Sequence, residues 1–447
     1  MPDTVDLERF RRAAAAGHPA AQFNLGLWHL RQAPPGIIPT EAHELLLAAA
    51  KQDFVPAQTL LGKLLFKLQG ADQQPLQARH WLERAAEAGD PEAQYRLGEL
   101  LAIGLTGQPD PTQGLAYLRR SAERGHLAAR TQAAYCLEHG VGCTPDARSA
   151  TQFCFIAARK DDARAQNMLG RRYAAGHTLP QNPVKALAWH LKAAAQAYPG
   201  AAAEVAKLSA ELGESATRDA QALARTAIAE DEPQPAQPAP VPQGPLLVQS
   251  EQPRIAVCRG FLSQDECDHL IALGTPFLEP SRVITQSGAQ EVADARTSEE
   301  MALQDQIKDL VVWEIEQRLA RLASLPVEHG EPLMILHYRR GAEYRPHVDY
   351  FDPRLESAGH SLARAGQRIV TVLTYLCDVA AGGGTAFPKI GLRIAPEKGK
   401  ALLFHNCKSD GGVEPLTQHA GEPVLAGEKW LATRWMRERD WRLSRST

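Results

Sequence analysis

Small apolar residues recur at a fixed spacing through the first half of the chain, and larger apolar residues recur between them. The small-residue phrase returns every 36 positions, with its alanine at Ala21, Ala57, Ala93, Ala129 and Ala165. A large side chain keeps the same period, at Leu45, Trp81, Tyr117, Phe153 and Trp189. Small residues allow two helices to approach closely, and a large residue fills the space between neighbouring pairs. The pattern therefore predicts helix hairpins that stack into an all-α solenoid over residues 6–212.

The phrases AAEAGDPEAQYRLGELL and RRYAAGHTLPQNPVKALAWHLKAAA resemble the sel-one-like repeats, which are relatives of the tetratricopeptide repeat. The resemblance implies a solenoid whose concave face binds a protein or peptide. The periodic residues themselves are interpreted as packing residues that build the array. Binding residues would lie between them, and the pattern does not single these out.

The pattern changes after residue 212. For residues 213–250 the sequence predicts a helical tail followed by a linker. The linker is predicted because the prolines of DEPQPAQPAPVPQGP favour extended backbone. Beyond it, short runs rich in Val, Ile, Leu, Thr and Tyr predict strands: EPLMILHYRRG, QRIVTVLTYL, TAFPKIGLRI and KALLFHN. Helices are expected at about 263–273, with Ser263 as N-cap, and at about 298–323. The fold class expected for residues 251–443 is α+β, a double-stranded β-helix or jelly roll with helices supporting one sheet.

Composition narrows the range of partners. The net charge of -3 gives no broad basic field, so nucleic acid is not expected. No run of about 18 uncharged apolar residues is present, and the first residues lack the apolar stretch of a signal peptide, so we expect a cytoplasmic protein without a membrane partner. The seven cysteines are scattered without a CxxC pair, which favours reduced thiols.

The candidate chemistry lies in the second half, in YRPHVDYF. His347 and Asp349 are two residues apart, so on an extended strand both side chains would leave the same face. Iron(II) oxygenases bind their metal through two histidines and one carboxylate, and His419 is the candidate third ligand. Lys429 could hold the far carboxylate of 2-oxoglutarate through a bond of about 1.5 to 3 kcal/mol. Each residue alone would more often be a surface or core residue, and the ordered set carries the prediction.

The span from Pro253 to Trp441 resembles the prolyl 4-hydroxylase family of iron(II) and 2-oxoglutarate dioxygenases. The shared segments are RGFLSQDECDHLIALG, RTS at 296–298, HYRRGAEYRPHVDYF, QRIVTVLTYL, GGGTAFP and HAGEPVLAGEKWLATRWMR. The resemblance implies Fe²⁺ as metal, 2-oxoglutarate and O₂ as cosubstrates, and ascorbate as a candidate reductant. It assigns iron to His347, Asp349 and His419, the cosubstrate to Lys429, Tyr338, Tyr375 and Thr433, and the substrate to Arg296, Tyr344, Arg368 and Trp435. Each of the last seven has an alternative interpretation as a structural residue.

The expected function is hydroxylation of a peptidyl substrate, with proline as the expected residue and the repeats recruiting a protein partner. Hydroxylation of a free amino acid or other small molecule is the alternative within enzymes. An inactive interaction scaffold is the alternative outside them. The sequence departs from the family at Gly384, where an acidic residue is common.

Overall fold

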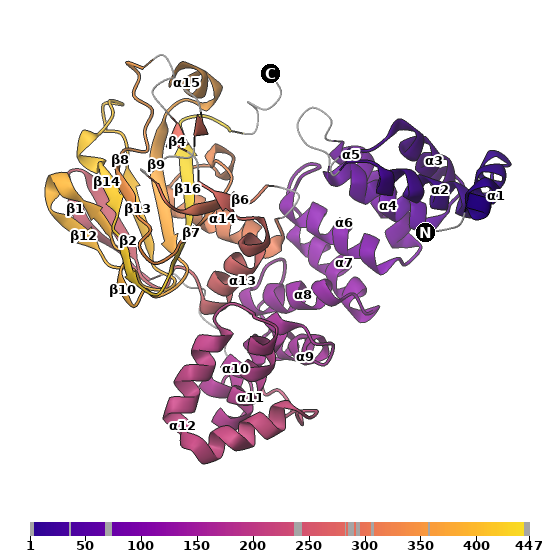
Figure 1. Ribbon diagram of the computed structural model, residues 1–447, viewed down its shortest axis with the longest axis horizontal. Coiled ribbons are helices and arrows are strands. Elements are labelled where there is room, and N and C mark those ends of the chain that lie inside the picture. The colour runs from indigo at the N-terminus through magenta and orange to yellow at the C-terminus, as the bar shows by residue number, and fades with distance from the viewer. Residues whose placement is uncertain are drawn as a thin grey trace. The chain divides into compact units, whose positions relative to one another are not determined.

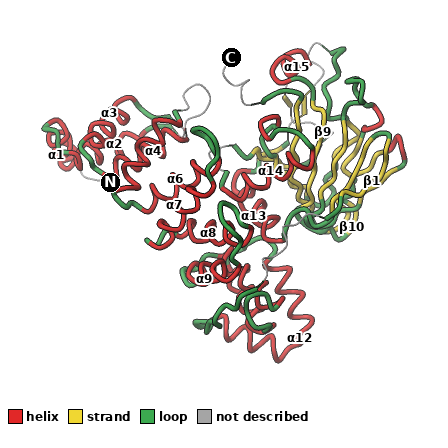
Figure 2. Tube along the Cα trace, turned by 180° about the vertical axis from the view of Figure 1, so that it is seen from behind, coloured by secondary structure: helices red, strands yellow, loops and turns green. Residues whose placement is uncertain are grey.

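Paired helices make up most of the first half of the chain (Figures 1 and 2). The computed structural model describes residues 4–34, 37–67, 74–236, 244–281, 283–284, 290–291, 296–304, 308–355 and 358–441. Two compact units form, Met1–Asn182 with Ala227–Ala239, and Pro183–Thr226 with Pro240–Thr447. The helices of the first unit are α1 (Thr4–Ala15), α2 (Pro19–Gln32), α3 (Thr40–Lys51), α4 (Val55–Lys67), α5 (Pro75–Glu87), α6 (Pro91–Ile103), α7 (Pro111–Glu123), α8 (Leu127–His139), α9 (Ala147–Ala158) and α10 (Ala163–Ala175). Consecutive helices pack against one another, which confirms the predicted solenoid.

The repeated glycines and glutamines explain the close packing of these helices. A Cβ added at Gly62 of α4 would lie 2.7 Å from Leu82 Cγ of α5, so the approach requires glycine. A glutamine follows four of the five periodic alanines, and its side chain reaches back to the end of the preceding helix. Nε2 of Gln58 and Nε2 of Gln94 donate to carbonyls eight residues earlier, over 3.1 Å in each case. The periodic phrase therefore builds the array.

Two antiparallel sheets dominate the second unit, which also contains α11 (Pro183–Ala195) and α12 (Ala201–Ala224). The large sheet runs in the order β1 (Leu246–Glu251), β2 (Arg254–Cys258), β13 (Ala401–His405), β9 (Arg368–Tyr375), β16 (Lys429–Arg437), β7 (Met334–Tyr338), β6 (Glu299–Ala302) and β3 (Glu279–Pro280). The small sheet runs in the order β12 (Leu392–Ile394), β11 (Thr385–Phe387), β14 (His419–Gly421) and β8 (Tyr344–His347). The short pairs are β10 (Ala381–Gly382) with β15 (Val424–Ala426), and β4 (Val283–Ile284) with β5 (Gln290–Glu291).

The core of this domain draws side chains from both sheets. Leu336, Leu373, Leu402 and Leu431 come from four strands of the large sheet, and they cluster with Phe387 of β11. Because side chains alternate along a strand, every second residue of β7, β9 and β16 faces this core. The predicted jelly roll is thereby confirmed.

Two helices support the domain. Helix α13 (Gln264–Gly274) begins as predicted after Ser263, whose hydroxyl and Glu266 form a capping box. The helix expected at about 298–323 was wrong in its first part, because residues 299–302 form β6 and pair with β7. Helix α14 (Leu310–Ala323) starts later, where the carboxylate of Asp309 accepts the backbone N–H of Val312. A third helix, α15, spans Gly359–Ala365.

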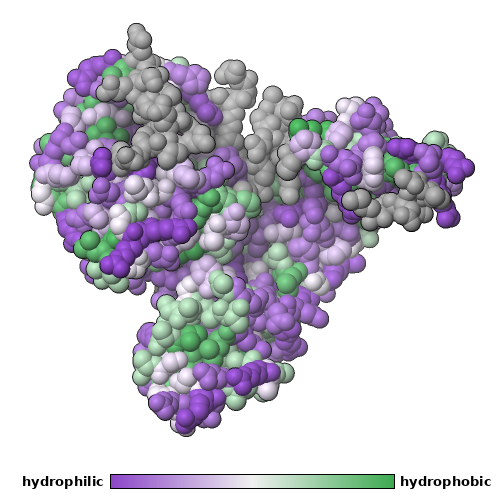
Figure 3. Space-filling model, viewed as in Figure 1, coloured by the Kyte–Doolittle hydropathy of each residue, from purple (hydrophilic) through white to green (hydrophobic). Residues whose placement is uncertain are grey.

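The surface is mainly hydrophilic on the face seen in Figure 3. None of the helices described has both the length and the hydropathy needed to span a bilayer.

Candidate metal centre and cosubstrate site

Neighbouring strands of the small sheet bring the two predicted histidine ligands together. His419 of β14 pairs with His347 of β8 in the antiparallel register. Asp349 lies in a bend two residues beyond His347, so the expectation that both occupy one extended strand was wrong in detail. Their ligand atoms nevertheless converge: those of His347, Asp349 and His419 all lie within 4.8 Å of one another. This is the composition of the iron(II) facial triad.

Backbone carbonyls orient both imidazole rings. Nδ1 of His347 lies 2.9 Å from the carbonyl oxygen of Arg345, and Nδ1 of His419 lies 3.0 Å from that of Thr417. Because a carbonyl can only accept, each Nδ1 carries the hydrogen and each Nε2 keeps its lone pair. Burial, together with the neighbouring His419, lowers the pKa of His347 to about 3. The ring is therefore neutral near neutral pH, as a metal ligand must be.

A hydrogen-bond chain holds the carboxylate of the triad. Thr371 of β9 donates its hydroxyl to Asp349 Oδ2 over 2.7 Å, and Asn406 Nδ2 donates to Thr371 Oγ1 over 2.9 Å. Burial opposes ionisation of Asp349, but His419, His347, Arg368 and this hydroxyl outweigh it and hold its pKa below the usual range. Sequence reasoning missed Thr371 and Asn406, and the alternation of β9 was a signal only for Thr371.

Lys429 is a buried cation at the start of β16. Lys429 is only 1% exposed. Its Nζ lies 5.2 Å from the ring centroid of Tyr338 and 5.8 Å from that of Tyr375. It makes no ion pair and no hydrogen bond with a described residue, and burial lowers its pKa to about 8. A buried ammonium group without an anion is unfavourable. The arrangement therefore fits an anionic ligand such as a carboxylate.

The other predicted cosubstrate residues share this inward face. Thr433 lies four residues after Lys429 on β16, so both side chains leave the same face of the strand. The buried hydroxyl of Thr433 has no hydrogen-bond partner in the described structure. Tyr375 is less available, because its hydroxyl is 2.7 Å from Thr385 Oγ1. Tyr338 pairs with Lys429 across β7 and β16. An unpartnered hydroxyl and an unpaired ammonium on one face fit the hydrogen-bond needs of a carboxylate.

Two of the four predicted substrate residues lie beside the triad. The ring of Tyr344 stacks on that of His347, with centroids 3.5 Å apart. The backbones of Arg296 and Tyr344 form an isolated antiparallel β-bridge. The guanidinium carbon of Arg296 lies 4.9 Å from the ring centroid of Tyr344. Arg296 Nη1 also pairs with Glu300 Oε2 at 2.8 Å. Residues 282, 285–289 and 292–295, which precede Arg296 in the chain, lie outside the described residues.

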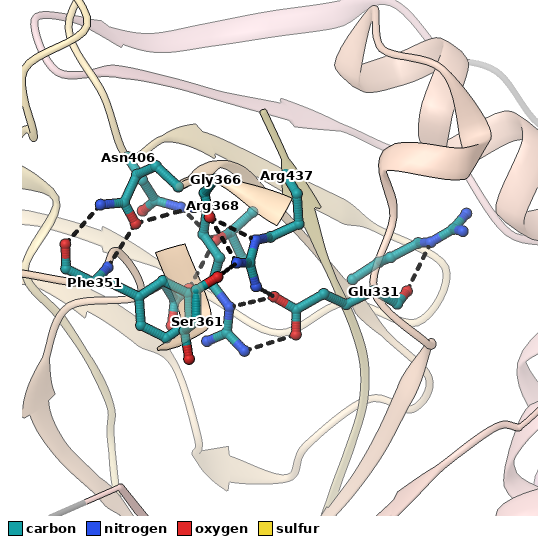
Figure 4. Close-up of polar contacts among 11 residues, drawn as sticks. Glu331, Phe351, Ser361, Gly366, Arg368, Asn406 and Arg437 are labelled. Atoms are coloured by element: carbon teal, nitrogen blue, oxygen red, sulfur yellow. Dashed lines mark hydrogen bonds and ion pairs between the residues drawn. The ribbon is translucent and has the colours of Figure 1, made fainter. Parts of the chain in front are cut away.

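The other two predicted substrate residues, Arg368 and Trp435, lie at a buried ionic cluster. Glu331 lies between the guanidinium groups of Arg368 and Arg437, and it binds Arg368 over 2.7 and 2.8 Å (Figure 4). The guanidinium carbon of Arg368 lies 3.9 Å from the ring centroid of Trp435. The indole Nε1 of Trp435 has no hydrogen-bond partner among the described residues. Trp435 therefore retains a free donor, whereas Glu331 already engages Arg368.

The carboxylate of Glu422 lies beside Gly384. A Cβ at Gly384 would clash with the carboxylate of Glu422, which follows β14 and pairs with Arg393 Nε at 2.6 Å. The space beside Gly384 thus already holds an acidic group.

Comparison with known proteins agrees with this geometry. Residues 333–437 match the model of the 2OG-Fe(II) oxygenase superfamily. A protein of Arabidopsis thaliana described as probable prolyl 4-hydroxylase 6 is 42% identical over 207 residues, which cover 42% of this chain and 70% of that protein. Prolyl 4-hydroxylase 2 of the same plant is 39% identical over 209 residues, which cover 42% of this chain and 68% of that protein.

The chain belongs to the prolyl 4-hydroxylase family. It is a 2-oxoglutarate-dependent dioxygenase that uses Fe²⁺, 2-oxoglutarate and O₂. A viral collagen prolyl hydroxylase from Paramecium bursaria Chlorella virus-1, solved with 2-oxoglutarate, is 26% identical, with a TM-score of 0.33 over 41% of this chain and 95% of that one.

The prolyl 4-hydroxylase family domain is preceded by five Sel1 repeats, which match at residues 19–54, 55–90, 91–126, 127–162 and 163–198. A Sel1 repeat protein from Oxalobacter formigenes is 26% identical, with a TM-score of 0.40 over 49% of this chain and 98% of that one. The predicted family assignments of both halves are confirmed.

Proposed function

We propose that this dioxygenase hydroxylates proline residues in a protein or peptide chain. The observation that carries the proposal is the convergence of His347, Asp349 and His419 in a domain that also buries Lys429, which forms no ion pair with a described residue. The proline substrate is supported by the relatives described as prolyl 4-hydroxylases.

The roles of the residues follow from their contacts. His347, Asp349 and His419 would hold iron(II), and Lys429 with Thr433 would bind the 5-carboxylate of 2-oxoglutarate. When bound, the metal and the keto acid supply the oxidation: O₂ and 2-oxoglutarate become succinate, CO₂ and one oxygen atom inserted into a substrate C–H bond. The chain's own contribution is to orient these groups and to keep them out of water.

Three side chains are proposed to contact the substrate. Tyr344 and Arg296 present an aromatic ring and a guanidinium group beside the triad. The indole N–H of Trp435 is an unused donor that could bind a carbonyl of the substrate chain. We interpret Arg368 as a positioning residue that packs against Trp435, because Glu331 already binds its guanidinium group.

The repeats are proposed to recruit a protein partner and so raise the local concentration of a protein substrate near the catalytic domain. A peptide substrate fits this architecture better than a free amino acid, which needs no recruiting array.

The test is succinate release by the purified protein supplied with iron(II), 2-oxoglutarate and ascorbate. A proline-containing peptide should stimulate release and gain one oxygen atom on proline, and free proline should not. His347→Ala should abolish release, while His360→Ala, at an exposed histidine of α15, should not change it. Equal stimulation by free proline and peptide would favour the small-molecule alternative. Equal release by wild type and His347→Ala would refute the dioxygenase site.

A further inference from the structure

An acidic, proline-containing segment of the chain lies against the repeat helices. Residues 227–236 read AIAEDEPQPA, and they form neither helix nor strand. This acidic segment belongs to the same compact unit as helices α1–α10. Its partners are Arg148 of α9, Arg159 just after α9, Tyr173 of α10 and Thr178 just beyond it, which we call the docking surface.

Backbone groups and two apolar side chains fix the acidic segment in place. The N–H of Gln234 donates to the carbonyl of Thr178 over 2.8 Å, and the N–H of Asp231 donates to the hydroxyl of Tyr173 over 3.4 Å. Ile228 and Pro233 are buried on either side of the acidic run. Backbone bonds and two small anchors can hold any extended chain of suitable spacing, so this part of the contact carries little sequence preference.

The two arginines of the docking surface give it a preference for an acidic segment. Arg159 binds both carboxylate oxygens of Glu230, and Arg148 Nη2 lies 2.8 Å from Glu232. Both arginines are exposed, with side-chain exposures of 63% and 45%, so each pair contributes at most about 1 kcal/mol. Pairs of this kind select an acidic peptide over a neutral or basic one, and they exchange readily with a competing carboxylate.

None of these contacts requires the acidic segment to be covalently part of the array. We propose that the docking surface is a binding site for an extended acidic segment ending in proline on a partner protein, and that residues 227–236 occupy it in cis until the partner displaces them. This deepens the proposed recruitment of a protein by the repeats, on which it rests. A segment of the same chain has an effective concentration of about millimolar, so a partner must bind with several segments or additional contacts to displace it.

The test is direct binding of a fluorescent peptide of sequence AIAEDEPQPA to the full chain, followed by anisotropy. In an open variant, Glu230→Lys with Glu232→Lys, the cis segment should leave the docking surface, and the peptide should bind at least tenfold more tightly than it binds wild type. Adding Arg148→Glu and Arg159→Glu to the wild-type chain should remove binding. Arg9→Glu with Arg12→Glu, at two exposed arginines of α1, is the matched control and should behave as wild type.

Charge reversal on both sides separates recognition from misfolding. A peptide with lysine at both glutamate positions should bind the Arg148→Glu, Arg159→Glu variant and not the open variant. Absence of peptide binding to the open variant, or equal binding to the open variant and to Arg148→Glu, Arg159→Glu, would overturn the proposal. Binding is measured without iron or 2-oxoglutarate, so this site and the hydroxylase activity can fail separately.

Discussion

Replacing Lys429 by methionine should weaken 2-oxoglutarate binding and leave the fold without its cosubstrate at least as stable as before. The side chain of Lys429 is buried near the rings of Tyr338 and Tyr375, and it forms no ion pair with a described residue. A charge-assisted hydrogen bond to a carboxylate contributes about 1.5 to 3 kcal/mol. At about 1.4 kcal/mol per tenfold, Lys429→Met should raise the KM for 2-oxoglutarate by about 10- to 150-fold.

The effect on stability has the opposite sign. Burial lowers the pKa of Lys429 from 10.5 in the unfolded chain to about 8. The folded state therefore binds the proton of Lys429 less tightly than the unfolded chain does. That cost is fully present below pH 8 and is relieved as pH rises towards 10.5, and it corresponds to about 3 kcal/mol as an upper bound. Methionine has similar volume and no charge, so the variant should gain stability near neutral pH.

Two measurements decide this prediction: the KM for 2-oxoglutarate from succinate release, and the free energy of unfolding from urea titration without cosubstrate. Leu431→Met, two positions along the same face of β16, controls for repacking. A variant that loses stability and keeps its KM for 2-oxoglutarate would show that Lys429 is a structural residue, and the reasoning above would be refuted.

Further predictions concern the groups around this site. The KM of wild type for 2-oxoglutarate should rise above about pH 8, because Lys429 loses its proton there, and the rise should vanish in Lys429→Met. Thr371→Val should weaken iron(II) binding by about 10- to 100-fold in a metal titration, whereas Thr374→Val on the outer face of β9 should not. Glu331→Gln should lower the free energy of unfolding by about 3 to 5 kcal/mol in urea, because two buried arginines lose their anion, and no change would show that solvent already screens the cluster.

Part of the candidate site could be predicted from the sequence because its residues are close together along the chain. Lys429 and Thr433 are spaced so that strand alternation alone places both on one face, whereas Asp349 lies in a bend beyond the strand that carries His347. The order of the set and its agreement with a family pattern added the distant His419. The helix at Ser263 was equally local, because a capping box involves residues only three apart.

The groups that the sequence did not reveal depend on contacts between distant segments. Glu331 and Arg368 are 37 residues apart, and the chain between them contains β7 and β8, so nothing local indicates that they pair. Residues 299–302 have good helix formers, yet pairing with the free side of β7 makes them a strand. Tertiary pairing decided both outcomes.

Gly384 and Glu422 show how such a contact changes the meaning of a motif. On sequence alone, Gly384 is the loss of an acidic residue from the family pattern. In the folded domain the carboxylate of Glu422 occupies the space beside it and pairs with Arg393, so a side chain at Gly384 would have to displace this carboxylate. Gly384→Glu should therefore lower the melting temperature, because it adds a clash and a second negative charge. Adding Glu422→Gly should restore most of the loss. Failure of that second change to restore stability would mean that the two positions do not share one acidic site.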